Sequence, residues 1–387
     1  MVTAAHPVQT PSPARIPHPA RASHATPSAP GTRFPALRHL GPNWYATVMG
    51  TAIIANAGAT LPYQFTGLRT ACTAVWALSL VMLAALLTAR AAHWVHHRDQ
   101  ARAHLLDPAV APFYGCLSMA LLAVGGGALL VGADWIGTGA AVAVDAVLFT
   151  LGTAIGLAAA VVIPYLMVVR HRITADQASP VWLLPVVAPM VSAALGPLLV
   201  PHLPAGQARQ TMLYACCAMF GLSLLATLVM LPVIFARLLT AGPLPTALTP
   251  TLFLVLGPLG QSTTAANKFA DVAPGVVPAP LDQGFLALAV LYGVPVTGFA
   301  LLWLALALAM VRRARRGGMG FAMTWWAFTF PVGTCVTGAE GLGKHTGLPA
   351  FDWLAAGLYA FLVAAWAVAL AHTVRGLVTG RLLAAPR

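Results

Sequence analysis

Long apolar segments alternate with short polar connections along nearly the whole chain. A helix that crosses a bilayer needs about 20 mostly apolar residues. Ten segments meet this requirement, and within them almost every residue is Ala, Leu, Val, Gly or aromatic. The predicted transmembrane helices are 41–62, 69–90, 111–132, 140–169, 180–201, 210–237, 248–270, 284–311, 320–341 and 350–375. The pattern therefore predicts an all-α membrane protein.

Gly and Pro are unevenly distributed among these segments. The five odd-numbered segments hold 26 of them in 111 positions, whereas the five even-numbered segments hold 10 in 134. Both residues weaken or kink helices, and in hydrocarbon an interrupted backbone is tolerated only against protein or a watery cavity. The alternation predicts five helical hairpins, with an inner ring of five kinked helices around a central pore. The alternative is that Gly and Pro are simply common in membrane helices.

Composition and charge support a membrane location. Only 8% of the residues are charged and 59% are hydrophobic, so we expect lipid to cover most of the outside. The net charge of +12 would suit nucleic acid, but the basic residues lie in short runs between apolar segments, so no nucleic-acid partner is expected. Seventeen basic residues fall on one side of the ten segments and four on the other. This split predicts a multi-pass protein of the plasma membrane with both termini in the cytoplasm.

The chain is predicted to divide into three parts. Residues 1–40 contain eight prolines, four arginines and no acid, a composition that predicts a disordered basic Pro/Ala-rich cytoplasmic tail. Residues 41–378 form the transmembrane domain. Residues 379–387 form a short cytoplasmic tail.

Polar residues gather in the first and seventh segments. Uncharged side chains of this kind can replace part of the hydration shell of an ion. Pro258 is expected to kink the seventh segment, and Lys268 at its outer end would either draw anions toward the mouth or extend to the lipid headgroups. The residues predicted to line the pore are Asn43, Thr47, Asn56, Gln261, Ser262, Thr263 and Thr264, with Lys268 at the mouth.

The ninth segment contains FAMTWWAFTFPVGTCVTG, in which Pro331 is expected to kink the helix. Phe330 directly precedes this proline, and Phe328 lies two residues earlier. An aromatic side chain at a kink in an inner helix can plug a narrow pore, because a dry constriction stops ions. The alternative is that both phenylalanines only pack against lipid or the protein core.

Other apparent sites carry little chemistry. GAEGLGKH at 338–345 resembles a phosphate-binding loop, but His345 replaces the required Ser or Thr and the stretch lies at a membrane edge. Four histidines between the second and third segments, His93, His96, His97 and His104, are predicted to belong to a solvated loop, and neither a metal site nor a cofactor is expected. Asp145 is taken as the only acid clearly near a span, which favours passive or potential-driven flow over proton-coupled pumping.

Three stretches carry a family resemblance. GPNWYATVMGTAII in the first segment, GPLGQSTTA in the seventh and WWAFTFPVG in the ninth resemble the tellurite-resistance/dicarboxylate transporter family. That family includes the bacterial tellurite-resistance channel, fungal malate permeases, sulfite exporters and plant slow anion channels. The resemblance implies ten helices in five hairpins, a central anion pore, commonly a homotrimer, and a gate at Phe330, with Phe328 as the second candidate.

The pattern and the resemblance together predict transmembrane transport of small anions through a channel-like pore gated by a phenylalanine. C4-dicarboxylates such as malate are the expected substrates, with the lipid bilayer as the other partner. The first alternative is a coupled exporter of sulfite or tellurite-type oxyanions. A membrane-embedded enzyme is the second alternative, but the segments contain no paired carboxylates, HExxH motif or Ser–His pair, so the chain is not expected to be an enzyme.

Overall fold

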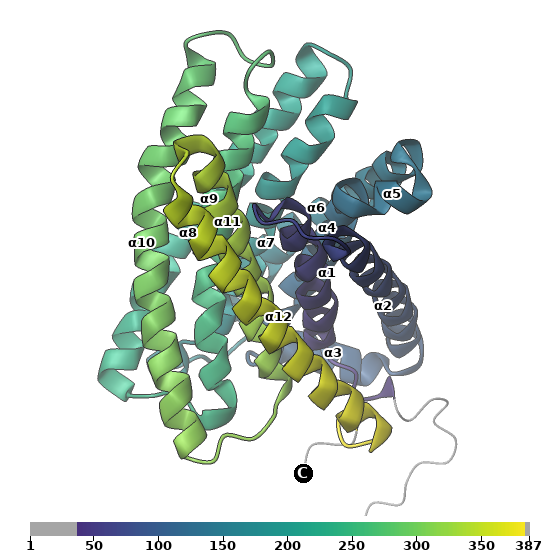
Figure 1. Cartoon of the computed structure of the whole chain (residues 1–387). Helices are drawn as coiled ribbons and strands as arrows, with labels where there is room; N and C mark the ends of the chain where they lie inside the picture. The colour runs from purple at the N-terminus through teal and green to yellow at the C-terminus, as the bar shows by residue number, and fades with distance from the viewer. Residues whose placement is uncertain (1–36, 384–387) are drawn as a thin grey trace, which may run out of the picture. The chain divides into compact units, whose positions relative to one another are not determined.

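The computed structural model describes residues 37–383, and this part of the chain is almost entirely helical (Figure 1). Seven helical stretches in it are long and apolar enough to cross a membrane, in agreement with the predicted all-α membrane protein. The α-helices are α1 (Tyr45–Thr60), α2 (Leu68–His96), α3 (Arg98–Leu106), α4 (Gly115–Gly127), α5 (Ala133–Ile136), α6 (Thr138–Val169), α7 (Leu183–Leu195), α8 (Gln207–Ala241), α9 (Leu256–Val272), α10 (Leu281–Arg316), α11 (Phe330–Thr346) and α12 (Pro349–Val378).

Three of the ten predicted spans are short α-helices in the structure. Helices α1, α9 and α11 have 16, 17 and 17 residues, and each follows a 3-10 helix, namely Pro42–Trp44, Thr246–Val255 and Met323–Phe328. The seven candidate spans do not include these three helices, so the number ten stays a prediction.

The two prolines expected to kink helices lie at the start of α9 and α11. Pro258 is the third residue of α9, and Pro331 is the second residue of α11. In the first turn of a helix the missing N–H of proline has no intrahelical partner to lose. Neither proline therefore interrupts the interior of its α-helix, and each lies shortly after a 3-10 helix.

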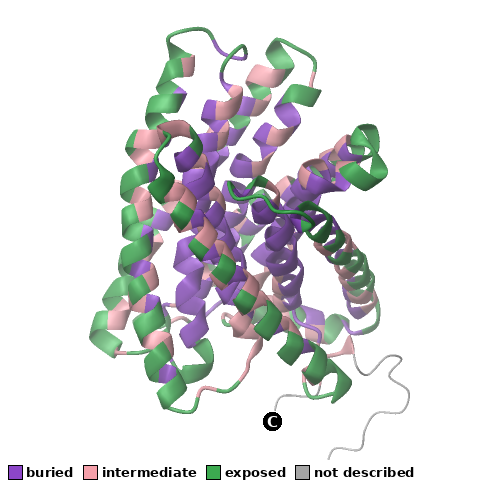
Figure 2. Ribbon diagram, in the orientation of Figure 1, coloured by how far each residue is buried: buried purple, intermediate pink, exposed green. Residues whose placement is uncertain are grey.

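Burial differs sharply between two sets of helices (Figure 2). The most apolar windows of Ala111–Ile136 and Pro180–His202 are 78% and 89% buried, whereas those of α2, α6, α8, α10 and α12 are only 17–28% buried. Most residues of α1, α9 and α11 are buried as well. The buried set corresponds to the Gly- and Pro-rich segments, because small residues allow helices to approach closely on several sides.

The buried helices pack against one another in a definite order. Helix α1 contacts α4, α4 contacts α7, α7 contacts α9, α9 contacts α11, and α11 contacts α1. Each is followed by a long exposed helix that packs on it, in the pairs α1–α2, α4–α6, α7–α8, α9–α10 and α11–α12.

The contact between α9 and α11 depends on a glycine. A Cβ atom at Gly260 would lie 2.5 Å from the backbone nitrogen of Cys335, too close for two non-bonded atoms. One turn earlier, Gly257 has nothing within 4 Å of the same position. Gly260 therefore allows the two backbones to approach, and Gly257 has no such role.

The predicted tail is described only in part. Residues 1–36 and 384–387 lie outside the described residues, so the predicted disorder of 1–36 stays a prediction. Residues 37–40 contact α2, where a ring nitrogen of His93 lies 2.8 Å from the carbonyl oxygen of Leu37. The buried Arg90 guanidinium donates to the carbonyl oxygen of Leu40 at 2.5 Å.

The interpretation of the four histidines as a solvated loop is wrong for two of them. His93 is fully buried and His97 is 2% exposed, and the ring of His93 stacks on that of His104 with centroids 5.5 Å apart. Burial lowers the pKa of His104 to about 4, and the positive charge of Arg90 adds to this shift. These contacts hold α3 against α2, and they could not be predicted from the polar composition of the loop.

Candidate functional site

A cavity of about 430 Å³ lies among the buried helices. All five of them contribute to its wall, together with the short segments that continue α4 and α7 and the first turn of α12. Its polar, charged and aromatic lining residues are Asn56, Thr60, Gln261, Thr264, Asn267, Lys268, Asp271, Phe330, Thr337, Glu340, Lys344 and Asp352.

The lining residues follow helical stripes. On α11 they recur at Phe330, Thr337, Glu340 and Lys344, with spacings of seven, three and four residues. Such spacings place side chains on one face of a helix. Since an α-helix rises 1.5 Å per residue, the stripe runs for about 21 Å from Phe330 to Lys344. The cavity is therefore elongated along α11, with Phe330 at one end and charged residues at the other.

A matching stripe on α9 faces it. Gln261, Thr264, Lys268 and Asp271 recur every three or four residues and line the same cavity. Thr264 joins the two helices, because its hydroxyl lies 2.7 Å from the hydroxyl of Thr337. The walls between the two ends thus carry hydroxyl and amide groups.

The first helix adds an amide with a free acceptor. The Asn56 side-chain nitrogen donates to the carbonyl oxygen of Ala123 at 3.0 Å, which ties α1 to α4. Its side-chain oxygen is buried and has no hydrogen-bond partner. This oxygen lies toward Gly127 of α4, where an added Cβ would come within 2.7 Å of it.

The two candidate gate residues lie in different surroundings. Phe330 is 2% exposed and lines the cavity as the first residue of α11. Phe328 ends the preceding 3-10 helix and packs edge-on against Phe253, with ring centroids 4.8 Å apart. Phe328 is not among the residues that line the cavity. The position of Phe330 fits a plug, and that of Phe328 fits core packing.

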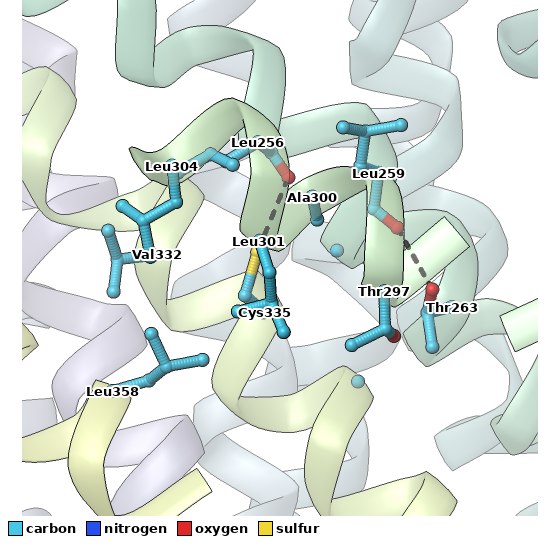
Figure 3. Close-up of a pocket in the computed structure, with 12 residues that line it drawn as sticks. Leu256, Leu259, Thr263, Thr297, Ala300, Leu301, Leu304, Val332, Cys335 and Leu358 are labelled. Carbon is cyan, nitrogen blue, oxygen red and sulfur yellow. Dashed lines mark hydrogen bonds between the residues drawn. The ribbon is translucent and has the colours of Figure 1, made fainter. Parts of the chain in front are cut away.

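Several residues predicted to line the pore lie elsewhere. Ser262 accepts a hydrogen bond from the hydroxyl of Tyr292 on α10, at 2.8 Å. Thr263 faces a different, mostly apolar space among α9, α10, α11 and α12 (Figure 3), whose volume of about 10 Å³ barely admits one water molecule. Asn43 and Thr47 are not among the residues that line the larger cavity. Four consecutive helical residues rotate through about 300°, so the run 261–264 cannot face one cavity.

The far end of the cavity holds a cluster of ionisable side chains, which we call the charged mouth: Lys268, Asp271, Lys344 and His345. The Asp271 carboxylate accepts a hydrogen bond from Lys344 at 2.5 Å and lies 3.5 Å from the Lys268 ammonium. A ring nitrogen of His345 lies 3.1 Å from the same carboxylate. The Lys344 side chain is 64% exposed, so the mouth reaches the surface. The carboxylate of Asp271 partly neutralises the charge of Lys268.

The sequence interpretation missed Glu340. It lies within α11, is 8% exposed and lines the cavity one turn before Lys344. Its Oε2 accepts a hydrogen bond from the Thr60 hydroxyl on α1, and its Oε1 is buried without a partner. A carboxyl group therefore lies among the buried helices. The sequence argument against proton-coupled pumping, which took Asp145 as the only acid clearly near a span, no longer holds. The spacing of Glu340 from Phe330 and Lys344, which places the three side chains on one helical face, could have indicated this residue from the sequence.

The fold and the cavity agree with the comparisons to known proteins. The sequence model for voltage-dependent anion channels matches residues 39–374, which is most of the chain. The chain belongs to this family. This confirms the resemblance carried by the first, seventh and ninth segments, and it makes the chain a membrane protein from a family of anion channels and transporters.

Three relatives illustrate the range of the family. An uncharacterized transporter of Methanocaldococcus jannaschii is 27% identical over 346 residues, covering 89% of this chain and 95% of that protein. A sulfite efflux pump of Trichophyton rubrum is 28% identical over 345 residues, covering 88% and 91%. The malic acid transport protein of Schizosaccharomyces pombe is 22% identical over 327 residues, covering 82% and 73%.

Proposed function

We propose that this protein carries small anions across the plasma membrane through a pore enclosed by α1, α4, α7, α9 and α11, with Phe330 as its gate. The observation that supports this proposal most strongly is the cavity, to which all five helices contribute and which has Phe330 at one end. Its middle is lined by uncharged polar groups that can replace water around an ion without trapping it. The order in which the five helices contact one another also supports the ring and the five hairpins.

Sulfite is the substrate we propose first, and malate the second candidate. The reason is the greater similarity of the chain to a sulfite efflux pump, at 28% identity, than to a malic acid transport protein, at 22%. The malate prediction came from a family resemblance that includes both malate permeases and sulfite exporters, so the similarity over the whole domain carries more weight. Both substrates are small oxyanions that hydroxyl and amide groups can bind.

In this proposal the chain crosses the membrane ten times, has both termini in the cytoplasm and assembles as a homotrimer. The excess of basic residues on one side of the spans supports this orientation. The large exposed apolar faces of the outer helices, such as α8 and α10, suit contact with lipid or with neighbouring subunits.

Flux into proteoliposomes tests the proposal. The purified full chain is expected to carry sulfite above the background of empty liposomes. Malate, nitrate and chloride are expected to be carried with lower permeability. A current–voltage series with these four anions gives the order of permeability. A higher permeability for malate than for sulfite would reverse the order of the two substrates. No flux of any of the four above background would refute the proposal.

A further inference from the structure

The ionisable residues that line the cavity do not match the charge expected of an anion path. They are two bases, Lys268 and Lys344, and three acids, Asp271, Glu340 and Asp352. With all five ionised, the lining carries one net negative charge, which opposes the entry of an anion. If one acid carries a proton, the lining is neutral. The question is which acid is suited to hold that proton.

Two of the acids have partners for a negative charge. Asp271 lies between both lysines and His345. Asp352 lies in the first turn of α12, where the N-terminus of the helix stabilises a negative charge. Glu340, by contrast, has one hydroxyl partner, and its second oxygen is buried with none. Burying an ionised carboxylate without full compensation is costly, so Glu340 is the acid suited to bind a proton.

The surroundings of Thr60 fit a protonated Glu340. The Thr60 hydroxyl has a single hydrogen but two acceptors in range, Glu340 Oε2 at 2.5 Å and the carbonyl oxygen of Asn56 at 3.4 Å. If Glu340 is ionised, Thr60 can donate to only one of them. If Glu340 is protonated, it can donate to the Thr60 oxygen while Thr60 donates to Asn56, and both contacts are satisfied.

Of the three acids that line the cavity, Glu340 has neither an ion pair nor a helix N-terminus to hold a negative charge. Helix α9 presents Lys268 and Asp271, and α12 presents Asp352 and Tyr359. Helix α1 presents the uncharged Thr60 and Asn56 to the cavity. On α11 itself, Lys344 and His345 follow by one turn, and both contact Asp271.

We propose that the cavity binds a small oxyanion only when Glu340 carries a proton, so that Glu340 makes anion flux depend on pH. The protonated carboxyl, whose O–H donates to Thr60, removes a negative charge from the path and leaves the lysines of the charged mouth to attract the anion. This inference rests on the proposed function. It adds a proton-binding site to the walls of the path.

Nitrate flux in proteoliposomes tests the proposal, because the charge of nitrate does not change between mildly acidic and mildly alkaline pH. One added charge near the path at an effective dielectric constant of about 20 changes anion entry by roughly tenfold or more. Wild-type flux is therefore expected to fall by about that factor on going from acidic to alkaline pH. Glu340→Gln, which cannot ionise, is expected to keep the acidic rate at both values.

The control variant is Asp145→Asn. Asp145 on α6 is also a buried acid with an unpartnered oxygen, but it does not line the cavity. It should keep the pH dependence of the wild type. Only variants that elute from size exclusion as the wild type does are compared.

Thr60→Val provides a second test if Glu340→Gln does not fold. It removes the hydroxyl that forms a hydrogen bond with the Glu340 carboxyl group, so the midpoint of the flux–pH curve should shift. The inference is overturned if wild-type nitrate flux does not depend on pH, if Glu340→Gln keeps the wild-type pH profile, or if Thr60→Val leaves the midpoint unchanged. Absence of flux for nitrate, sulfite and malate at every pH would instead refute the proposed function, and this inference with it.

Discussion

Replacing Phe330 by alanine should open the pore. The side chain is 2% exposed and lines a cavity of about 430 Å³, so in the proposed pore its removal should join this space to the region beyond it. A hydrophobic constriction blocks ions because it excludes water. A severalfold rise in anion current requires a barrier lowered by only about 1 kcal/mol. We therefore expect at least this increase in current from Phe330→Ala at equal protein density in planar bilayers.

The structure also supplies a control. Phe328→Ala removes the same atoms from a residue that is 9% exposed and packs on Phe253 and Trp325, away from the cavity lining. Both variants should lose about 3–5 kcal/mol of stability, as is usual for a buried phenylalanine, but only Phe330→Ala should gain current. Equal currents in the two variants, or an increase in Phe328→Ala alone, would refute the assignment of the gate to Phe330.

Three further predictions follow from single contacts. Gly260→Ala should lower the free energy of unfolding by about 1–3 kcal/mol, because its Cβ would meet the backbone of Cys335, whereas Gly257→Ala should be tolerated; thermal denaturation in detergent compares them. Lys268→Gln should reduce anion flux more at low than at high salt, because exposed charge is screened, and equal reductions would contradict an electrostatic role. The lowered pKa of His104 means that the unfolded chain binds its proton more readily. Stability should therefore be complete above about pH 6.5, fall by roughly 1 kcal/mol toward pH 4, and fall less in His104→Gln.

The helical membrane architecture could be predicted from the sequence because apolar length and Gly/Pro content act locally. The short α1, α9 and α11 were less predictable, since a hydropathy window does not distinguish a 3-10 helix from an α-helix. Within the seventh segment, polar character alone could not separate Gln261 and Thr264, which line the cavity, from Ser262 and Thr263, which face α10. That separation follows from the geometry of the helix, because consecutive side chains of an α-helix point about 100° apart.

Tertiary contacts explain the two clearest failures. His93 belongs to a polar stretch, and its burial depends on residues 37–40, more than 50 positions away. Glu340 lies in a Gly-rich stretch at the end of a predicted span, and its role depends on Thr60, at a separation of 280 positions. Long-range partners of this kind cannot be predicted from the sequence, although the spacing of Glu340 from Phe330 and Lys344 is that of one helical face.

The proton proposed on Glu340 also bears on how the anion is driven. One charge that crosses 100 mV gains about 2.3 kcal/mol, and a dianion gains about twice as much. Sulfite changes between a monoanion and a dianion near neutral pH, so acid conditions that favour a protonated Glu340 also favour the monoanion. The path would then open to the form with the smaller electrical driving force but the smaller cost of dehydration. An exported anion would pass Phe330 first and leave through the outer mouth, so the neutral polar walls between them, rather than fixed positive charges, would carry it outward.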